Sequence, residues 1–283
     1  MKAPSFAYAK PNTLAEVYDL LERHGDEARL LAGGQSLIAT LNLRLSSPEL
    51  LIDITGLPGL SGIKLDKGML RIGALTTHSE VEHSGAIAEH LPLLAQAVPH
   101  IAHTAIRNVG TFGGSVALAD PASEYPACCL ALDAQFVIAG RKGERRVAAR
   151  DFFKGLYDTD LRPGEVLTAG EFKLAPGYRS AFLELARRHG DYAIVGLAAH
   201  GKMAGGKFSD LRLAFLGVGG KPLLAKSAAA AIEGKACGAD SIAAAQAALA
   251  RDLDPPGDLY SSAATKLHLA RVLTGRALAA LAA

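Results

Sequence analysis

Two glycine-rich segments of this chain contain the residue types that bind phosphate. The first is Leu31 to Leu37 (LAGGQSL) and the second is Gly110 to Ser115 (GTFGGS), and each joins a Gly-Gly pair to a small hydroxyl residue. Glycine lets a backbone approach a ligand closely, and successive N–H groups can form an anion-binding concavity. Two such loops far apart in the sequence therefore predict one diphosphate that is held from two sides.

The familiar short motifs do not describe either loop. No Gly-Lys-Ser/Thr follows Gly34, so the first loop is not a P-loop. The same loop lacks the second glycine of a hydrolase elbow, and the later run Gly217 to Pro222 lacks the third glycine of the dinucleotide fingerprint. A Gly-Gly pair after a strand often forms only a tight turn, so the first loop by itself leaves that alternative open.

Other residues that could do chemistry form no convincing catalytic pair. The nearest carboxylates, Asp120 and Glu124, follow the second loop directly. Several histidines cluster without the cysteines or carboxylates that would complete a metal site, so we expect solvated helix histidines. These histidines are His78, His83, His90, His100 and His103. The three cysteines are too few to hold an ordinary iron–sulfur cluster, which must then belong to another chain.

The second loop lies within a longer run that resembles a known signature. Residues 106–126 (IRNVGTFGGSVALADPASEYP) are similar to the flavin-binding segment of the medium subunits of molybdenum hydroxylases, the carbon monoxide dehydrogenase and xanthine dehydrogenase group. The first loop, the segment Leu51 to Ile54 and the segment Ile72 to His78 (IGALTTH) resemble the same family. Order and spacing agree over nearly the whole chain.

The resemblance implies that this chain carries FAD. Ala32 to Ser36 would hold the diphosphate from one side and Thr111 to Ser115 from the other, with Glu124 near the ribose hydroxyls and Asp120 as a second polar contact. Tyr192 would lie over the isoalloxazine, although a surface tyrosine is the alternative, and the apolar positions could equally be plain core. The residues expected to bind FAD are Leu31, Ala32, Gly33, Gly34, Gln35, Ser36, Leu37, Thr77, Ile101, Gly110, Thr111, Phe112, Gly113, Gly114, Ser115, Asp120, Glu124, Leu167 and Tyr192.

The family likeness also implies a function and partners. We expect an electron-transfer subunit that works with a small chain holding two two-iron two-sulfur clusters and a large chain holding the molybdopterin cofactor, as a dimer of heterotrimers. Substrate would be oxidised on the large chain, and electrons would pass through the clusters to FAD and on to an external acceptor. Two alternatives stay open, namely a flavin-free assembly scaffold and a stand-alone FAD oxidase.

The elements that must position these loops point to an α+β protein. The resemblance implies an FAD-binding domain of the vanillyl-alcohol-oxidase (PCMH) type at 1–175, with subdomains at about 1–58 and 59–175, and a carbon monoxide dehydrogenase flavoprotein-like domain at 176–283. A helix should begin after Thr13, with Glu16 closing a capping box. Further elements are predicted as strands at 28–31, 50–54, 69–75, 135–139 and 164–174 and a helix at 89–103.

The last hundred residues change their periodicity. Three strands are predicted at 180–187, 193–203 and 211–218, with a hairpin turn at Gly205-Gly206, followed by helices at 225–232, 242–251 and 262–281. The pattern predicts a three-stranded antiparallel sheet followed by three helices.

Composition excludes several other classes of function. The chain of 283 residues is 49% hydrophobic and 20% charged, and its formal net charge of +2 argues against nucleic acid or an anionic membrane as partner. No apolar stretch approaches the roughly 20 residues of a membrane span, and the first residues lack the apolar core of a secretion signal. A cytoplasmic location is the expectation that follows.

Overall fold

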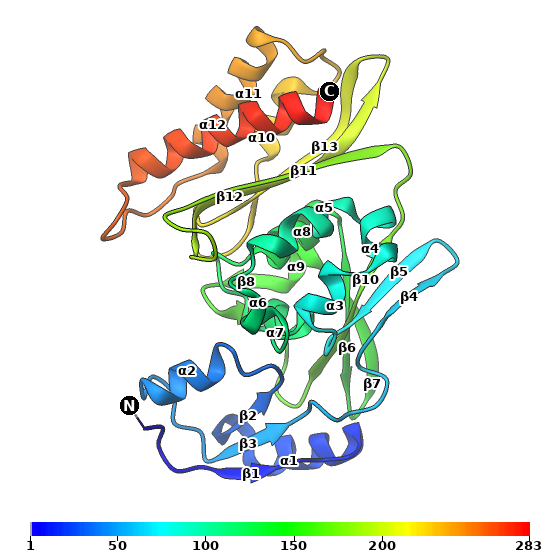
Figure 1. Cartoon of the computed structure of the whole chain (residues 1–283), viewed down its shortest axis with the longest axis vertical. Helices are drawn as coiled ribbons and strands as arrows, with labels where there is room; N and C mark the ends of the chain where they lie inside the picture. The colour runs from blue at the N-terminus through cyan, green and yellow to red at the C-terminus, as the bar shows by residue number, and fades with distance from the viewer. Residues whose placement is uncertain (1) are drawn as a thin grey trace.

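The N-terminal part of the protein forms a small parallel sheet. A computed structural model describes residues 2–283 (Figure 1). Strands β1 (Ala7–Ala9), β3 (Leu50–Asp53) and β2 (Ala28–Leu31) pair in that order, and both pairs are parallel. Helix α1 (Leu14–His24) and a short 3-10 turn, η1 (Gly25–Glu27), precede β2, and α2 (Leu37–Asn42) follows it. The first glycine loop therefore starts at the carboxyl end of β2.

Thr13 is the N-cap of α1, as predicted. The Thr13 side chain accepts a hydrogen bond from the backbone N–H of Glu16 at 3.2 Å. The Glu16 carboxylate accepts from the N–H of Asn12, one residue before the position that a capping box would use. Thr13 is thus the N-cap, while Glu16 stabilises the preceding turn.

The middle part of the chain forms a five-stranded sheet whose neighbouring strands are all antiparallel. The strands follow the order β4 (Ile63–Asp66), β5 (Met69–Gly73), β10 (Val166–Lys173), β6 (Gln135–Gly140) and β7 (Gly143–Ala148). Helices lie between this sheet and the C-terminal sheet (Figure 1): α3 (His78–Glu82), α4 (Gly85–His90), α5 (Pro92–Ala97), α6 (Thr104–Arg107), α7 (Phe112–Leu118), α8 (Glu124–Ala131) and α9 (Ala149–Phe152). A small hairpin, β8 (Phe153–Gly155) and β9 (Asp158–Thr159), follows α9.

The single helix predicted at 89–103 is wrong. Helix α4 ends at His90, α5 begins at Pro92, and a 3-10 turn, η2 (Val98–His100), contains Pro99. Leu91 between the first two helices has φ −130° and ψ 59°, outside the helical region. Proline has no N–H for a helical hydrogen bond and constrains the residue before it, so each proline starts a new turn.

The C-terminal part has the predicted three long strands and three helices. Strands β11 (Tyr178–Ala186), β12 (Ala193–Ala204) and β13 (Lys207–Leu216) are antiparallel neighbours, and a two-residue strand that the sequence pattern missed, β14 (Leu223–Leu224), adds a fourth at the edge. Gly205 and Gly206 turn the β12–β13 hairpin with φ of 58° and 74°. The helices are α10 (Lys226–Ile232), α11 (Ala239–Asp252) and α12 (Ala263–Ala282).

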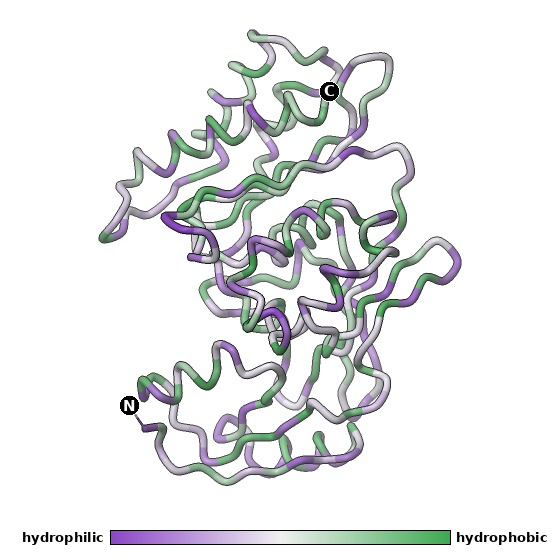
Figure 2. The backbone as a smooth tube through the Cα atoms, in the orientation of Figure 1, coloured by the Kyte–Doolittle hydropathy of each residue, from purple (hydrophilic) through white to green (hydrophobic). Residues whose placement is uncertain are grey.

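The C-terminal sheet is apolar on both faces. Leu197 and Leu213 belong to a buried cluster with α10, α11 and α12, whereas Phe182, Ala198 and Ala214 pack into the core of the middle part. Figure 2 shows the hydrophobic residues of β12 and β13 between the helix layers, and hydrophilic residues at the tip of the β4–β5 hairpin. Among residues 2–283, no helix is both long enough and apolar enough to span a bilayer.

Candidate functional site

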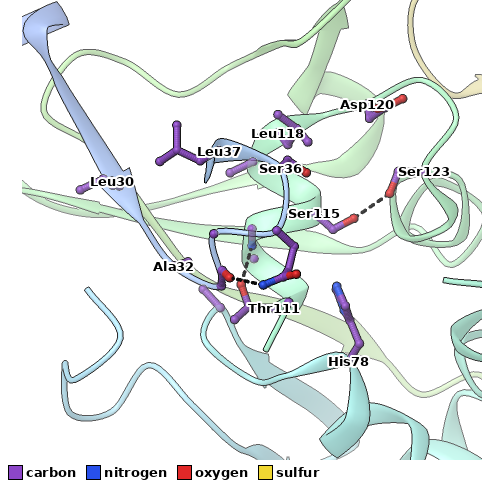
Figure 3. Close-up of a pocket in the computed structure, with 18 of the residues that line it drawn as sticks. Leu30, Ala32, Ser36, Leu37, His78, Thr111, Ser115, Leu118, Asp120 and Ser123 are labelled. Atoms are coloured by element: carbon purple, nitrogen blue, oxygen red, sulfur yellow. Dashed lines mark hydrogen bonds between the residues drawn. The ribbon is translucent and has the colours of Figure 1, made fainter. Parts of the chain in front are cut away.

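The two glycine loops meet in one cavity. Its volume is about 690 Å³. Its walls come from the N-terminal part, from the segment between β5 and α8, from the β8–β9 hairpin and the start of β10, and from the link between β11 and β12. Its lining includes these predicted residues: Ala32, Gly33, Gly34, Gln35, Ser36, Leu37, Ile101, Gly110, Thr111, Gly113, Gly114, Ser115, Asp120, Glu124, Leu167 and Tyr192. Figure 3 shows Ala32 of the first loop beside Thr111 of the second, with Ser36 and Ser115 farther along the wall.

Three predicted residues lie outside the lining. Phe112 is fully buried and packs against Tyr125, with a ring distance of 5.3 Å. Thr77 caps α3, where its hydroxyl accepts from the N–H of Glu80 and the Glu80 carboxylate accepts from the N–H of Thr77. The Leu31 side chain lies against Gly34, where an added Cβ would be 3.1 Å from its Cδ1. These three residues support the walls from behind.

The first loop offers backbone donors that the chain does not use. Within residues 2–283, the five consecutive N–H groups from Gly33 to Leu37 have no acceptor. Gly34 adopts φ +68°, and the Gln35 side-chain amide donates to the carbonyl of Gly33 at 2.9 Å, which stabilises the bend. A run of unpaired N–H groups at one turn is the arrangement that binds an anion.

The second loop has the opposite character, because within the described residues each of its N–H groups except that of Thr111 already has an acceptor. The N–H groups of Phe112 and Gly113 donate to the carbonyls of Thr76 and Ala74, both at 2.8 Å. A Cβ at Gly113 would lie 2.4 Å from the Cβ of Ala74, so this glycine is required by packing against the chain itself.

The same loop continues as the N-terminal turn of α7. The N–H of Gly114 donates to the Thr111 hydroxyl at 3.0 Å, and the N–H of Ser115 donates to the Thr111 carbonyl at 3.1 Å. The Ser115 hydroxyl shares a 2.7 Å hydrogen bond with the hydroxyl of Ser123, which also lines the cavity. The second loop therefore presents hydroxyl groups to the cavity, while the first presents backbone N–H groups.

The two loops also touch each other directly. A Cβ on Gly33 would lie 2.3 Å from the carbonyl oxygen of Val109 and 2.7 Å from the Cα of Gly110. The lack of a side chain at Gly33 therefore allows the backbone of the first loop to contact the backbone of Val109 and Gly110. The cavity wall is continuous across this junction, although the loops lie more than 70 residues apart in the sequence.

Two carboxyl groups of the cavity lining, those of Glu124 and Asp120, have different surroundings. Glu124 begins α8 and is only 8% exposed, and burial first, then Glu184 and Asp120, raise its pKa to about 8. Asp120 has both oxygens engaged, one by the N–H of Ala122 at 2.9 Å and the other by the Tyr157 hydroxyl at 3.3 Å. Glu124 is therefore a neutral acid near pH 7 that can donate as well as accept a hydrogen bond.

His78 corrects the expectation of a solvated helix histidine. It is 5% exposed and lines the cavity, and burial, with a smaller contribution from Arg107, lowers its pKa to about 4. Its Nδ1 is buried without a hydrogen-bond partner among the described residues. A Cβ at Gly110 would lie 2.7 Å from Nε2, so this glycine makes room for the ring. His83 and His103 are exposed as expected, while His90 and His100 are half-buried.

The comparisons with known proteins identify the family of the chain. The protein-family model described as the FAD binding domain in molybdopterin dehydrogenase matches residues 4–171. The family model of the CO dehydrogenase flavoprotein C-terminal domain matches residues 180–281. The chain belongs to this family. It is an FAD-binding subunit of the molybdopterin dehydrogenases and an oxidoreductase subunit.

Relatives resemble the chain over nearly its full length. It is 38% identical to the 6-hydroxypseudooxynicotine dehydrogenase complex subunit alpha of Paenarthrobacter nicotinovorans, covering 99% of this chain and 95% of the relative. It is 30% identical to the xanthine dehydrogenase FAD-binding subunit of Escherichia coli O157:H7, covering 95% and 93%. The solved carbon monoxide dehydrogenase from Hydrogenophaga pseudoflava matches with a TM-score of 0.97 at 38% identity, covering 99% and 98%. The predicted family, FAD-binding fold and cofactor are confirmed.

The residues of this flavoprotein that hold FAD stay a prediction, and the cavity adds candidates that the motifs did not supply. His78 and Ser123 lie inside the segments that carry the resemblance, so their chemistry could have been noticed there. Tyr157 and Glu165 come from the β8–β9 hairpin and the turn that follows it, where no motif marks them. Further lining residues outside the prediction include Arg29, Leu30, Thr40, Ser46, Leu118 and Asp191.

Proposed function

We propose that this chain holds FAD in the cavity and passes electrons from the iron–sulfur clusters of a partner chain to an external acceptor. The observation that carries this proposal is the run of five unpaired N–H groups from Gly33 to Leu37 on the cavity wall. A cavity of about 690 Å³ with mostly apolar walls and a few directed polar groups also suits a large planar cofactor. FAD supplies the redox chemistry, and the chain supplies binding and orientation.

The chain's own groups divide this work between the two loops. The N–H groups of Gly33 to Leu37 hold the diphosphate without a cation, because oriented backbone dipoles stabilise negative charge in a dry loop. The hydroxyls of Ser36, Thr111 and Ser115 add hydrogen bonds from both sides. Glu124, being neutral, donates a hydrogen bond toward the ribose hydroxyls or accepts one from them.

The apolar and aromatic residues fix the plane of the flavin. Ile101 and Leu167 are buried apolar residues of the cavity lining. Tyr192, which is 70% exposed at the mouth, stacks on the isoalloxazine while leaving its redox edge to a partner.

The partners follow from the same assignment. We infer a small iron–sulfur chain and a large molybdopterin chain, assembled as a dimer of heterotrimers, with residues 1–175 (subdomains about 1–58 and 59–175) and 176–283 as the domains of this subunit. The relatives are named as subunits of complexes, which supports a multi-chain assembly. The described cysteines are free thiols, which suits the cytoplasm as a reducing compartment.

Analysis of the native complex tests the proposal. Affinity purification through a tag on this chain should yield two further chains, with one FAD and about four irons for each molybdenum, as two two-iron two-sulfur clusters require. A complex that assembles with metals but never contains flavin would favour the scaffold. Turnover of an organic substrate by the isolated chain under oxygen would favour the stand-alone oxidase.

A further inference from the structure

Tyr157 lines the cavity but has no role in the proposed function. Tyr157 occupies the two-residue turn between β8 and β9, because Gly155 pairs with Asp158. Its φ of +53° is the left-handed conformation that bulky residues rarely adopt. Glycine or asparagine would turn the chain more easily at this position. Its side chain lines the cavity and is 57% exposed.

The tip of this hairpin is tied to the second loop's side of the cavity. The Tyr157 hydroxyl donates to Oδ2 of Asp120 at 3.3 Å, while Oδ1 of the same carboxylate accepts from the N–H of Ala122. Asp120 is itself buried. With both oxygens engaged inside the protein, this carboxylate is suited to hold Tyr157 in place.

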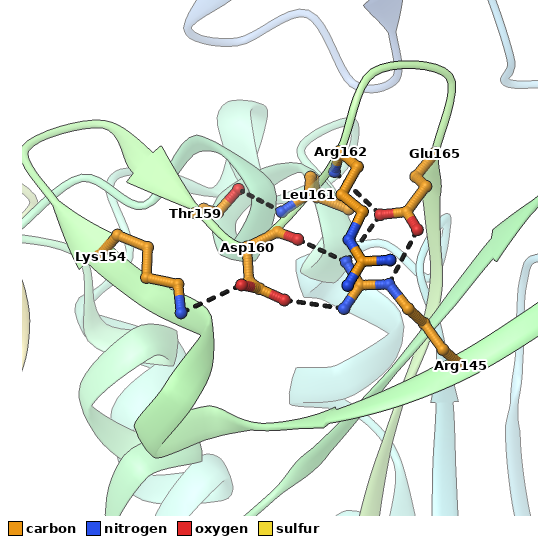
Figure 4. A network of polar contacts seen from close by, with 7 residues as sticks. All are labelled: Arg145, Lys154, Thr159, Asp160, Leu161, Arg162 and Glu165. Atoms are coloured by element: carbon orange, nitrogen blue, oxygen red, sulfur yellow. Dashed lines mark hydrogen bonds and ion pairs between the residues drawn. The ribbon is translucent and has the colours of Figure 1, made fainter.

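The base of the β8–β9 hairpin is held by a group of ion pairs. Figure 4 shows Arg145 of β7 between two carboxylates, with Nη1 2.7 Å from Oδ2 of Asp160 and Nη2 2.7 Å from Oε2 of Glu165. Lys154 of β8 pairs with the other Asp160 oxygen at 3.0 Å. Because these charges bridge β7, β8 and the turn after β9, the hairpin cannot swing away from the cavity without breaking several ion pairs.

Two tyrosines therefore stand at the same mouth on different elements. Tyr192 comes from the β11–β12 link and Tyr157 from the β8–β9 hairpin, and both line the cavity. Partial burial, then Asp120 and lastly Tyr192 raise the pKa of Tyr157, which places the two phenols within electrostatic range of each other.

We propose that Tyr157 is a second aromatic contact of the bound flavin, covering it from the hairpin side of the mouth, and that Asp120 is the positioning residue that holds Tyr157 there. This inference rests on the proposed function. An aromatic ring held over a planar π-system adds contact beyond its buried area and excludes water. Asp120 then acts on the cofactor through Tyr157, in place of the direct polar contact predicted from the sequence.

The test measures FAD release and flavin exposure in the FAD-loaded full chain and in the purified complex. We expect Tyr157→Ala to release FAD about tenfold faster, to increase quenching of flavin fluorescence by iodide and to shift the flavin absorption spectrum. Tyr157→Phe keeps the ring and loses the tether, so its release should quicken only about threefold. Leu156→Ala is the matched control, because Leu156 shares the same turn and is 65% exposed but does not line the cavity.

A double-mutant cycle separates the positioning role of Asp120 from a direct one. If Asp120 acts through the tyrosine hydroxyl, Asp120→Ala combined with Tyr157→Phe should release FAD no faster than Asp120→Ala does by itself. Additive effects would overturn the positioning role. Thermal unfolding of each FAD-free variant checks that the fold is retained, and Tyr157→Phe keeps the test meaningful if Tyr157→Ala misfolds.

Other outcomes overturn the inference or its foundation. Tyr157→Ala with release and quenching equal to those of Leu156→Ala overturns it. So does a Tyr157→Ala chain that loses its partner subunits while keeping the wild-type FAD release rate, because Tyr157 would then be a protein contact. A wild-type chain that binds no FAD refutes the proposed function itself, and this inference with it.

Discussion

The two glycine loops share a composition and differ in what their backbone does. The first follows a β-strand and has five N–H groups without an acceptor among residues 2–283. The second begins a helix and has acceptors for every N–H group from Phe112 to Ser115. The glycines of the first loop give access to a ligand and to the neighbouring loop. Those of the second let α7 pack against the turn after β5. A Gly-Gly pair therefore indicates that something lies close to the backbone. Only the hydrogen bonds show whether that is a ligand or another segment of the chain.

The comparison extends to how each side meets the cofactor. The first side uses backbone dipoles, which do not titrate, while the second side ends at Glu124, whose buried carboxyl does. We therefore expect a change of pH to alter the protonation of Glu124 on the second side. The first side should respond only to substitutions that change its backbone conformation. Four changes test this contrast, beginning with the largest expected effect.

Glu124→Gln should remove most of the pH dependence of stability between pH 7 and pH 8 in the FAD-free chain. The raised pKa of about 8 means that the folded chain keeps a proton that the unfolded chain loses near pH 4.5. In the wild type, this contribution of Glu124 to the free energy of unfolding is fully present below about pH 4.5. It is lost as the pH rises from 4.5 to about 8, with a slope of up to about 1.4 kcal/mol per pH unit. His78 and His200 contribute only below their unfolded pKa of 6.5, and with their pKa lowered to about 4 they make stability rise with pH there.

Urea unfolding at pH 7 and at pH 8 measures this effect. Glu184→Gln is the control, because the pKa of Glu184, raised by burial, is about 7 and its contribution fades earlier. Equal slopes for wild type and Glu124→Gln would contradict a buried neutral acid at this position.

Gly113→Ala should lower the free energy of unfolding by about 1–3 kcal/mol, the usual cost of an extra methyl group in a packed site. The new Cβ would lie 2.4 Å from the Cβ of Ala74 and would strain the hydrogen bond from the N–H of Gly113 to the Ala74 carbonyl. Denaturant unfolding of the FAD-free chain measures this. Unchanged stability together with lost FAD would reverse the comparison, because the second loop would then serve the ligand directly.

Gly34→Ala should reduce FAD affinity about tenfold, while the unfolding free energy falls by about 1–2 kcal/mol from the left-handed backbone. Gly34 has φ +68°, and an added Cβ would also crowd Leu31 and Ile38 at 3.1 Å, so the loop must shift. Gly205→Ala is the matched control, because Gly205 has φ +58° in an open hairpin turn and does not line the cavity. Fluorescence titration with FAD separates the two variants, and equal affinities would mean that the first loop does not bind the diphosphate.

The sequence could predict this contrast only in part. It placed both loops, the cap at Thr13 and the C-terminal strands and helices, because each depends on a local pattern. It did not predict the burial of His78, which results from the packing of α3 against the second loop, nor the place of Tyr157, whose partner Asp120 lies 37 residues away. Pro92 and Pro99 divide the segment 89–103 into shorter helices, an effect that the apolar periodicity by itself does not predict.

Gln35→Ala should produce the smallest effect and the sharpest test of preorganisation. The side-chain amide of Gln35 donates to the Gly33 carbonyl at 2.9 Å across the bend of the first loop. This hydrogen bond is exposed to solvent, so its loss should cost only about 0.5–1 kcal/mol and reduce FAD affinity about threefold. Because the backbone N–H groups remain, a faster FAD release with an unchanged association rate is the expected signature in stopped-flow fluorescence. A loss of affinity as large as that of Gly34→Ala would show that the amide itself contacts the cofactor, and the division between backbone donors on one side and side-chain groups on the other would no longer hold.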